Sequence, residues 1–302
     1  MLDHPFRTSN SVLEKWSPNC LGSPQGFYIK RDDLIHPIVS GNKWRKLKYA
    51  VQDAVDKGCN RMVTYGGAYS NHMVAVACAC ATLGLKSTCF IRGDELSGNE
   101  NHYLALAKWY GMQFIPVERE VFRNKKTELF FEHFGEIPES YYVAEGGSGE
   151  LGQQGVSEVM EELDFAPDYL FHASATATTS AGLTAGIQKD LRFENTKIKS
   201  VCVLKNEAEQ MEVLKMVNHE NTHLVVGYEF GGYAKVNDEL MEFVKAFIAE
   251  TGILIDPVYT GKALFSIKKM YETGEIKKSE RVIFLHTGGT LGLFSAKFLN
   301  YF

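Results

Sequence analysis

Residues 61–85 read RMVTYGGAYSNHMVAVACACATLGL, and this stretch contains three consecutive structural signals. The run from Arg61 to Tyr65 is short and rich in apolar residues, which is typical of a buried strand. A Gly-Gly turn follows, and a series rich in alanine and cysteine then predicts a helix. A strand, a turn and a helix in this order form the unit from which parallel sheets are built.

The same order of elements recurs along the 302 residues. Short apolar runs, each followed by a loop signal, occur at residues 87–91, 114–117, 141–144, 169–171, 200–204, 223–226 and 281–285. Helical patterns lie between such runs, for example at residues 99–110, 150–163 and 238–250. This alternation predicts an α/β fold with parallel sheets, which bind ligands at the carboxyl ends of their strands. The length predicts two domains or one large one, with Gly146 to Gly149 as a crossing between domains.

The composition excludes several classes of protein. Hydrophobic residues make up 45% of the chain and charged residues 23%, which excludes a disordered chain. A net charge of −5 gives no general attraction for nucleic acid, so no nucleic-acid partner is expected. No apolar run reaches the ~18–20 residues that cross a bilayer, so no membrane partner is expected either.

The N-terminus and the cysteines indicate the compartment. The chain does not begin with a basic segment followed by an apolar one, so a signal peptide is not expected. The six cysteines include no Cys-x-x-Cys pair, which argues against a zinc ribbon and against thioredoxin-like redox chemistry. We therefore expect a cytoplasmic protein with small buried thiols such as Cys78 and Cys80, and no metal site.

Two familiar motifs are better explained by their surroundings. Residues 219–223 read HENTH and match a zinc-protease pattern, but they continue into an apolar run and are expected to form a loop before a strand. Residues 147–152 match the dinucleotide pattern G-x-G-x-x-G, but the acidic residue expected about 20 positions later is poorly matched. We therefore expect neither a zinc protease nor a nicotinamide enzyme.

Four other segments carry polar residues that a core would not select. In the first, Gly41-Asn42-Lys43, the lysine follows a glycine at a predicted helix start. A partly buried amine in this position has a lowered pKa, so Lys43 is a candidate for a Schiff-base lysine. Lys46 and Lys48, in the same predicted helix, are expected to be solvated.

The remaining segments offer groups that bind anions and rings. Ser70-Asn71-His72 lies at the first turn of a helix, where free N–H groups favour a carboxylate, although a simple N-cap is the alternative. The loop within residues 172–183 combines hydroxyls with a helix start and suits a phosphate, although a Thr-rich turn is the alternative. The loop at residues 285–290 follows a strand, and residues 256–262 offer the hydroxyl of Tyr259. A lysine, an anion cradle and a carboxylate pocket together suit pyridoxal phosphate and an amino-acid substrate.

Five motifs, in this order along the chain, resemble the 1-aminocyclopropane-1-carboxylate deaminase / D-cysteine desulfhydrase family. They are Lys30-Arg31-Asp32-Asp33-Leu34, Gly41-Asn42-Lys43-x-Arg45-Lys46-Leu47, Gly66-Gly67-x-x-Ser70-Asn71-His72, Asp256-Pro257-Val258-Tyr259-Thr260-Gly261-Lys262 and His286-Thr287-Gly288-Gly289. The resemblance begins at about Tyr28 and runs to the C-terminus. These are pyridoxal-phosphate enzymes of the tryptophan-synthase-β-like fold type II.

The resemblance implies two α/β domains with open, twisted, largely parallel sheets and the cofactor between them, assembled as a homodimer. The large cofactor-binding domain would comprise residues 1–48 and 150–302, and the smaller domain residues 49–149. Lys43 would link the cofactor and move the proton at the substrate α-carbon. The resemblance assigns the other contacts as follows: Asn71 to the ring oxygen of the cofactor, Thr287 near its pyridine nitrogen, Ala175, Thr176, Ala177, Thr178 and Thr179 to its phosphate, Ser70 and His72 to the substrate carboxylate, and Tyr233 and Tyr259 to the substrate.

The phosphate loop departs from the family pattern, because the family has glycines where this chain has Ala175, Ala177 and Thr178. Alanine disfavours positive φ by about 1 kcal/mol or more. Substrate preference is indicated by Thr260 and Thr287, where members that open the cyclopropane ring have Glu and Leu. A neutral hydroxyl at Thr260 or Thr287 can hydrogen-bond the pyridine nitrogen without forcing it to be charged, which suffices for D-cysteine-type α,β-elimination to pyruvate, ammonia and sulfide. The alternative is that Thr260 faces away from the ring and the difference has no meaning. Deamination of the cyclopropane amino acid is the alternative, and a non-catalytic protein that retains the fold is a further one.

Overall fold

The computed structural model describes residues 4–93, 101–125, 127–217 and 219–301. Its strands are β1 (Leu13–Trp16), β2 (Phe27–Lys30), β3 (Arg61–Gly66), β4 (Lys86–Arg92), β5 (Gln113–Val117), β6 (Ser140–Tyr142), β7 (Tyr169–Ser174), β8 (Lys197–Cys202), β9 (Thr222–Val225) and β10 (Val282–Leu285). Its α-helices are α1 (Gly41–Asp56), α2 (Asn71–Leu83), α3 (His102–Trp109), α4 (Arg119–Arg123), α5 (Glu128–Phe134), α6 (Glu150–Glu161), α7 (Thr178–Lys189), α8 (Glu207–Val217), α9 (Asp238–Thr251), α10 (Thr260–Thr273) and α11 (Ala296–Leu299).

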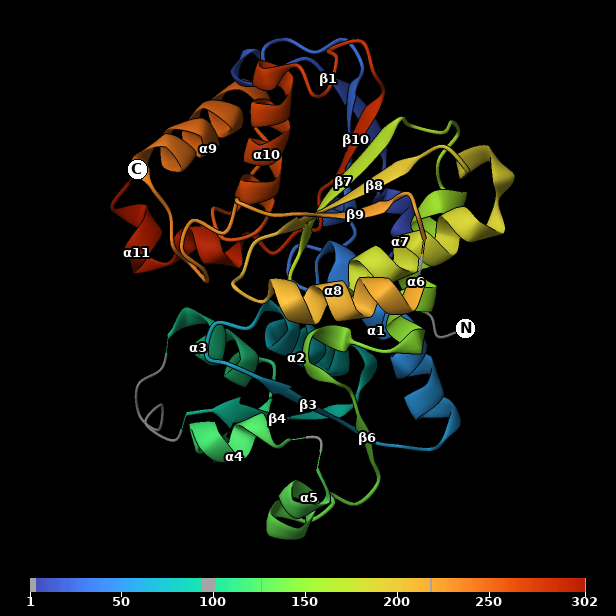
Figure 1. The fold of residues 1–302 in the computed structure, drawn as a ribbon. Helices are drawn as coiled ribbons and strands as arrows, with labels where there is room; N and C mark the ends of the chain where they lie inside the picture. Colours follow the sequence, from blue (N-terminus) through green and yellow to red (C-terminus); the bar gives the residue numbers. More distant parts are fainter. Residues whose placement is uncertain (1–3, 94–100, 126, 218, 302) are drawn as a thin grey trace.

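The strands form two sheets, which lie in the upper and lower halves of Figure 1. The six-stranded sheet has the order β1-β2-β10-β7-β8-β9, and the four-stranded sheet has the order β5-β4-β3-β6. Every pair of neighbouring strands is parallel except β1 and β2. The predicted α/β fold with largely parallel sheets is therefore confirmed.

All eight predicted apolar runs lie on strands of these sheets. The helix predicted at residues 99–110 corresponds to α3, although its first two residues lie outside the described part of the chain. The HENTH motif is not helical, because its last two residues begin β9, so the predicted loop before a strand is confirmed. Strands β1 and β2 were not predicted from the sequence.

In the six-stranded sheet, strand β10 lies between β2 and β7 and pairs with both. Phe284 pairs with Ile29 on one side and with Phe171 on the other, and all three side chains are buried. Helix α6 packs against both α1 and α7, and Figure 1 shows α9 and α10 beside the same sheet. The carboxyl ends of β7 and β10 therefore open toward the N-terminal ends of α7 and α1.

Helix α2 is buried on all sides, which matches its apolar sequence. Every residue from Met73 to Cys80 has at most 2% of its surface exposed. Cys78 and Cys80 are free thiols in this core, as predicted. Because α2 is held rigidly against the four-stranded sheet, its polar first turn is held in a fixed place.

The predicted domain boundaries have a partial counterpart in the two sheets. Strands of the four-stranded sheet lie within residues 61–142, and those of the six-stranded sheet lie within residues 13–30 and 169–285. Helix α1 continues across the predicted boundary at residues 48 and 49, so the boundaries themselves stay a prediction. Within the described ranges, no helix is both long and apolar enough to cross a lipid bilayer.

Candidate active site

A cavity of about 570 Å³ lies where the N-terminal ends of three helices meet. Its wall includes residues at the starts of α1, α2 and α7, together with the turn that follows β10. The N-terminal end of a helix carries unpaired N–H groups and a partial positive charge. Three such ends around one cavity favour an anionic ligand.

Two lysines of α1 line the cavity. Burial lowers the pKa of Lys43 from 10.5 to about 8, as the sequence analysis expected for a Schiff-base lysine. The prediction that Lys46 is solvated is wrong, because only 4% of its surface is exposed and it also lines the cavity. Burial and the charge of Lys43 lower the pKa of Lys46 well below its usual value. Lys48 is ion-paired with Glu158 rather than freely solvated, and it is absent from the described cavity wall.

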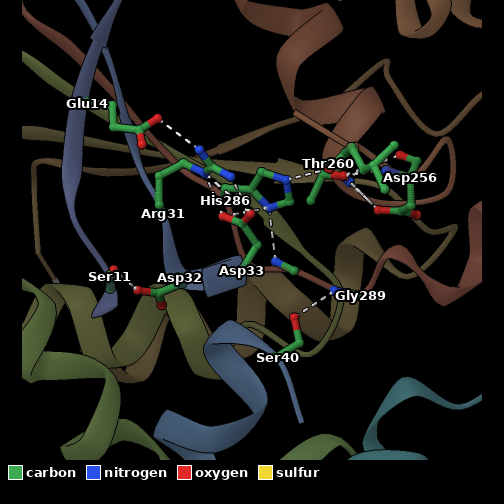
Figure 2. Close-up of polar contacts among 12 residues, drawn as sticks. Ser11, Glu14, Arg31, Asp32, Asp33, Ser40, Asp256, Thr260, His286 and Gly289 are labelled. Carbon is green, nitrogen blue, oxygen red and sulfur yellow. Dashed lines mark hydrogen bonds and ion pairs between the residues drawn. The ribbon is translucent and has the colours of Figure 1, made fainter. Parts of the chain in front are cut away.

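A buried ion-pair network fixes the start of α1. The guanidinium of Arg45 makes two 2.7 Å hydrogen bonds to Asp32 and also contacts Glu162 at 2.8 Å. Ser11 donates to the same Asp32 carboxylate at 2.6 Å, as Figure 2 shows. Arg45 and Asp32 are completely buried, so each carboxylate and guanidinium offsets the desolvation cost of the other. The motif residues Asp32 and Arg45 therefore anchor the helix that carries Lys43.

The first turn of α2 brings Ser70, Asn71 and His72 to the cavity wall. Ser70 accepts a hydrogen bond from the Met73 N–H at 3.2 Å, so the N-cap alternative is also true. Oδ1 of Asn71 and Nδ1 of His72 are buried and have no hydrogen-bond partner among the described residues. An unpaired buried polar atom is costly, so both atoms indicate a bound ligand.

The ring orientation of His72 is set by Thr64. The Thr64 hydroxyl donates to the Val143 carbonyl at 3.1 Å, so it accepts from Nε2 of His72 at 2.9 Å. Nδ1 is then an acceptor. Burial and the charges of Lys43 and Lys46 lower the pKa of His72 well below its usual value. A carboxylate needs a donor, which this neutral ring does not present at Nδ1.

The predicted phosphate loop, residues 175–179, lies between β7 and α7 and lines the cavity. Ala177 has φ 55° and ψ 0°, the left-handed conformation that the sequence analysis associates with the family's glycines. Asn206 donates to the Ala175 carbonyl at 2.6 Å, and Gln210 donates to the Ser174 carbonyl at 3.4 Å. At Ala177, therefore, the backbone takes a conformation that glycine adopts more readily, while Ala175 and Thr178 do not have positive φ.

The turn after β10 places Thr287 on the cavity wall. Its shape depends on His286, which donates from Nε2 to the Leu254 carbonyl at 2.8 Å and accepts at Nδ1 from the Gly288 N–H at 3.1 Å. Figure 2 shows this ring beside Asp33, whose Oδ1 is 3.9 Å from Nδ1. Gly288 has φ +75°, and a Cβ there would lie 1.5 Å from the Ser40 hydroxyl, so only glycine fits.

The tyrosines lie at different depths. Tyr259 lines the cavity, and burial raises its pKa well above the usual value. Tyr233 is absent from the described cavity wall and is 47% exposed, with its ring centroid 6.4 Å from that of Tyr259. The structure therefore places Tyr233 beside the cavity rather than in its wall.

Thr260 is not available to a ligand in this cavity. Its hydroxyl is bonded to Asp256, as Figure 2 shows, and its side chain is fully buried outside the described cavity wall. The expectation that Thr260 contacts a pyridine nitrogen is therefore wrong. The cause is the Asp256 carboxylate, which also accepts the N–H groups of Val258 and Tyr259 at 2.8 Å and so fixes the turn that leads into α10.

The cavity fits pyridoxal phosphate. It combines an amine of lowered pKa, a second buried lysine in Lys46, a hydroxyl-rich loop at a helix start and the side-chain amide of Asn71, whose oxygen has no partner among the described residues. The phosphate needs donors and positive potential, and the aldehyde needs the amine. Fold and site together define the class of α/β enzymes that use a pyridoxal cofactor.

Comparisons with known proteins agree with this class. The family described as "Pyridoxal-phosphate dependent enzyme" matches residues 12–288. A Pyrococcus horikoshii protein, designated a provisional 1-aminocyclopropane-1-carboxylate deaminase, is 32% identical and covers 88% of this chain and 85% of its own. The Arabidopsis thaliana mitochondrial protein named bifunctional D-cysteine desulfhydrase/1-aminocyclopropane-1-carboxylate deaminase is 30% identical, over 96% of this chain and 79% of its own. A crystal structure of an "ACC deaminase homologue" has a TM-score of 0.77 at 25% identity, covering 97% and 94% of the two chains.

The chain therefore belongs to the pyridoxal-phosphate dependent enzymes, in the 1-aminocyclopropane-1-carboxylate deaminase / D-cysteine desulfhydrase family. Its fold is the tryptophan-synthase-β-like fold type II of these relatives.

Several residues that shape the site carried no local signal. Asn206 and Gln210 hold the predicted phosphate loop through hydrogen bonds to the carbonyls of Ala175 and Ser174. Gln210 lies on α8, whose sequence is otherwise typical of a surface helix, and Asn206 directly precedes this helix. Lys125 and Glu145 form a 3.1 Å ion pair on the cavity wall, although they belong to segments far apart in the sequence. Pairwise contacts of this kind become visible only when the fold is known.

Proposed function

We propose that this protein is a pyridoxal-phosphate lyase that opens a small amino acid by D-cysteine desulfhydrase-like α,β-elimination. With D-cysteine, the products are pyruvate, ammonia and hydrogen sulfide. The supporting observation is the neutral hydroxyl of Thr287 on the cavity wall, at the position that the resemblance assigns to the pyridine nitrogen. Since Thr260 is engaged by Asp256, the argument now depends on Thr287 alone.

The chain's own residues have distinct proposed roles. When bound, pyridoxal phosphate supplies an electron sink for the pair left at the substrate α-carbon. Lys43 takes the α-proton, because its lowered pKa makes the neutral amine accessible near neutral pH. The N-terminal turn of α2, with Ser70, holds the substrate carboxylate through its N–H groups. Tyr259, which also lines the cavity, faces the substrate, and a thiolate leaves from the β-carbon.

Two alternatives have specific support. Deamination of 1-aminocyclopropane-1-carboxylate is supported by the name of the Arabidopsis relative, which gives that protein both activities. A non-catalytic protein that retains the fold is supported by the strained alanine in the phosphate loop. The presence of Lys43, Asn71 and Tyr259 around the same cavity argues against it.

The test is a comparison of substrates on the purified holoenzyme. D-cysteine, β-chloro-D-alanine and 1-aminocyclopropane-1-carboxylate are assayed in parallel, and the visible absorption spectrum reports bound cofactor. We expect D-cysteine to give pyruvate with a higher kcat/KM than the cyclopropane compound. The proposal fails if the cyclopropane compound has the higher kcat/KM, or if neither D-amino acid yields pyruvate. A protein without a cofactor spectrum would favour the non-catalytic alternative.

We also propose the assembly and location that the sequence analysis expected. A homodimer and a large domain of residues 1–48 and 150–302, with a smaller domain of residues 49–149, stay predictions. So does a cytoplasmic location, which the six free thiols support because thiols persist in reducing compartments. Size-exclusion chromatography with light scattering tests the assembly.

A further inference from the structure

Lys262 is a fully buried lysine in the first turn of α10, outside the described cavity wall. Its Nζ donates to the carbonyl of Glu229 at 2.8 Å, of Gly232 at 2.9 Å and of Val203 at 3.1 Å. An ammonium group has three N–H donors, so all of them are used. Burial lowers the pKa of Lys262 to about 8, and the charges of Asp256 and Glu229 oppose that shift.

Two of these carbonyls belong to the loop between β9 and α9, which carries Tyr233. Phe230, Gly231, Gly232 and Ala234 in this loop all have positive φ, at 51°, 93°, 118° and 53°. Positive φ is unfavourable for Phe230 and Ala234, so this conformation must be held by contacts from outside the loop. The bonds from Lys262 to the carbonyls of Glu229 and Gly232 are such contacts.

The bond to Gly232 acts directly on Tyr233. The Gly232 carbonyl belongs to the peptide unit that precedes Tyr233, so a fixed carbonyl fixes the direction in which that side chain leaves the backbone. Lys262 also lies three residues after Tyr259, on the first turn of the same helix. The two tyrosine rings meet edge to face at 67°, and the Tyr233 hydroxyl donates to the Tyr69 carbonyl at 3.3 Å.

We infer that Lys262 is a positioning residue, which sets Tyr233 against Tyr259 beside the cavity by holding the Gly232 carbonyl. An apolar side chain could fill the same volume but would remove all three bonds, and the carbonyls of Glu229 and Gly232 would keep only the backbone N–H groups of Gly232 and Lys235 as donors. The inference rests on the proposed function, since it gives Tyr233 a role toward the substrate that depends on Lys262.

A double-mutant cycle tests this coupling on the holoenzyme. The variants are Lys262→Met, Tyr233→Phe and the pair, with Lys268→Met as the matched control, because Lys268 lies on the same helix and pairs with Glu272 at the surface. We expect Lys262→Met to lower kcat/KM by up to ~10²-fold through misplacement. We expect the double variant to lose no more than the worse single variant, with the cofactor spectrum unchanged. Losses that multiply in the double variant, or wild-type kinetics in Lys262→Met, would overturn the inference.

A second measurement does not depend on turnover. Hydrogen–deuterium exchange of residues 226–237 should be faster in Lys262→Met than in wild type, and unchanged in Lys268→Met. If Lys262→Met does not fold, the cycle and the exchange are repeated with Lys262→Gln, which keeps two donors on a shorter side chain. Unchanged exchange in the folded variant refutes the inference. If the loop loosens but wild type converts none of the three amino acids, the proposed function fails and the loop anchoring stands.

Discussion

The hydroxyl of Thr260 donates to Oδ1 of Asp256 across 2.8 Å, and both side chains are buried at the start of α10, away from the described cavity wall. Thr260→Val removes this bond and should lower the free energy of unfolding by ~1–3 kcal/mol. The ratio of kcat/KM for D-cysteine and the cyclopropane compound should stay the same. Urea denaturation and the two assays measure these effects. A change in this kcat/KM ratio would show that Thr260 does act in the active site.

Lys43 is predicted to carry the cofactor link and to move the α-proton. Lys43→Ala should lose the borohydride-reducible adduct, with a loss of turnover beyond the ~10²–10⁴-fold typical of one general base. Lys48→Ala is the control, because Lys48 is on the same helix but pairs with Glu158. Peptide mapping after reduction locates the adduct. A pyridoxyl group on another lysine of the wild-type enzyme would contradict the assignment.

The lowered pKa of Lys43 makes the stability of the apoprotein depend on pH. The pKa is about 8 in the folded chain and 10.5 in the unfolded one, so the unfolded chain binds more protons between these values. Stability therefore rises with pH in this window, by at most ~1.4 kcal/mol per pH unit. We expect apo wild type to gain stability relative to apo Lys43→Met between about pH 8 and about pH 10. If the difference in unfolding free energy between the two apoproteins stayed constant across this pH range, the Lys43 amine would titrate normally.

Replacing Ala177 with glycine should stabilise the protein, because the φ of 55° at this position is unfavourable for a residue with a Cβ. Ala177→Gly should raise the free energy of unfolding by up to ~1 kcal/mol. Ala181→Gly is the opposite control, since Ala181 is buried within α7 and should lose ~1 kcal/mol. Thermal unfolding of the holoenzymes measures both. Destabilisation by both glycines would mean that position 177 is not strained.

The hydroxyls of the phosphate loop should contribute to cofactor retention. Thr176→Val and Thr179→Val should each weaken cofactor binding by ~1–3 kcal/mol, because a charged acceptor loses a donor. Thr184→Val is the control, since that hydroxyl donates to the Ser180 carbonyl within α7. Cofactor titration of the apoproteins measures the affinities. Wild-type affinity in both loop variants would place the phosphate elsewhere.

Much of the fold could be predicted because apolar runs and helical patterns are local properties of the chain. The starts of α1, α2 and α7 were found in the same way, since polar residues after a strand or a glycine indicate a helix start. These local patterns could not predict which polar side chains are buried. Lys46 looks like a solvated lysine of a basic helix, and only the packing of α1 beside α6 and the cavity encloses it.

Partners that are distant in sequence were also beyond the sequence analysis. Thr260 was expected near the cofactor because family members that open the cyclopropane ring have Glu at this position, whereas its hydroxyl donates to the Asp256 carboxylate. Lys262 looks like an ordinary residue of a helix start, and its three carbonyl partners come from two separate loops. Such side chains acquire their roles from topology, which the local pattern does not contain.

The place of β10 between β2 and β7 also orders events during biosynthesis. The ribosome delivers β2 early and β10 late, so the six-stranded sheet stays open while the four-stranded sheet already has all its strands. The turn that carries Thr287 follows β10, and the cavity wall is therefore completed last. Cofactor capture must wait until β10 and this turn have been synthesised. A chain that stops before residue 282 exposes the edge of β7, which invites pairing with other chains and makes such fragments substrates for chaperones.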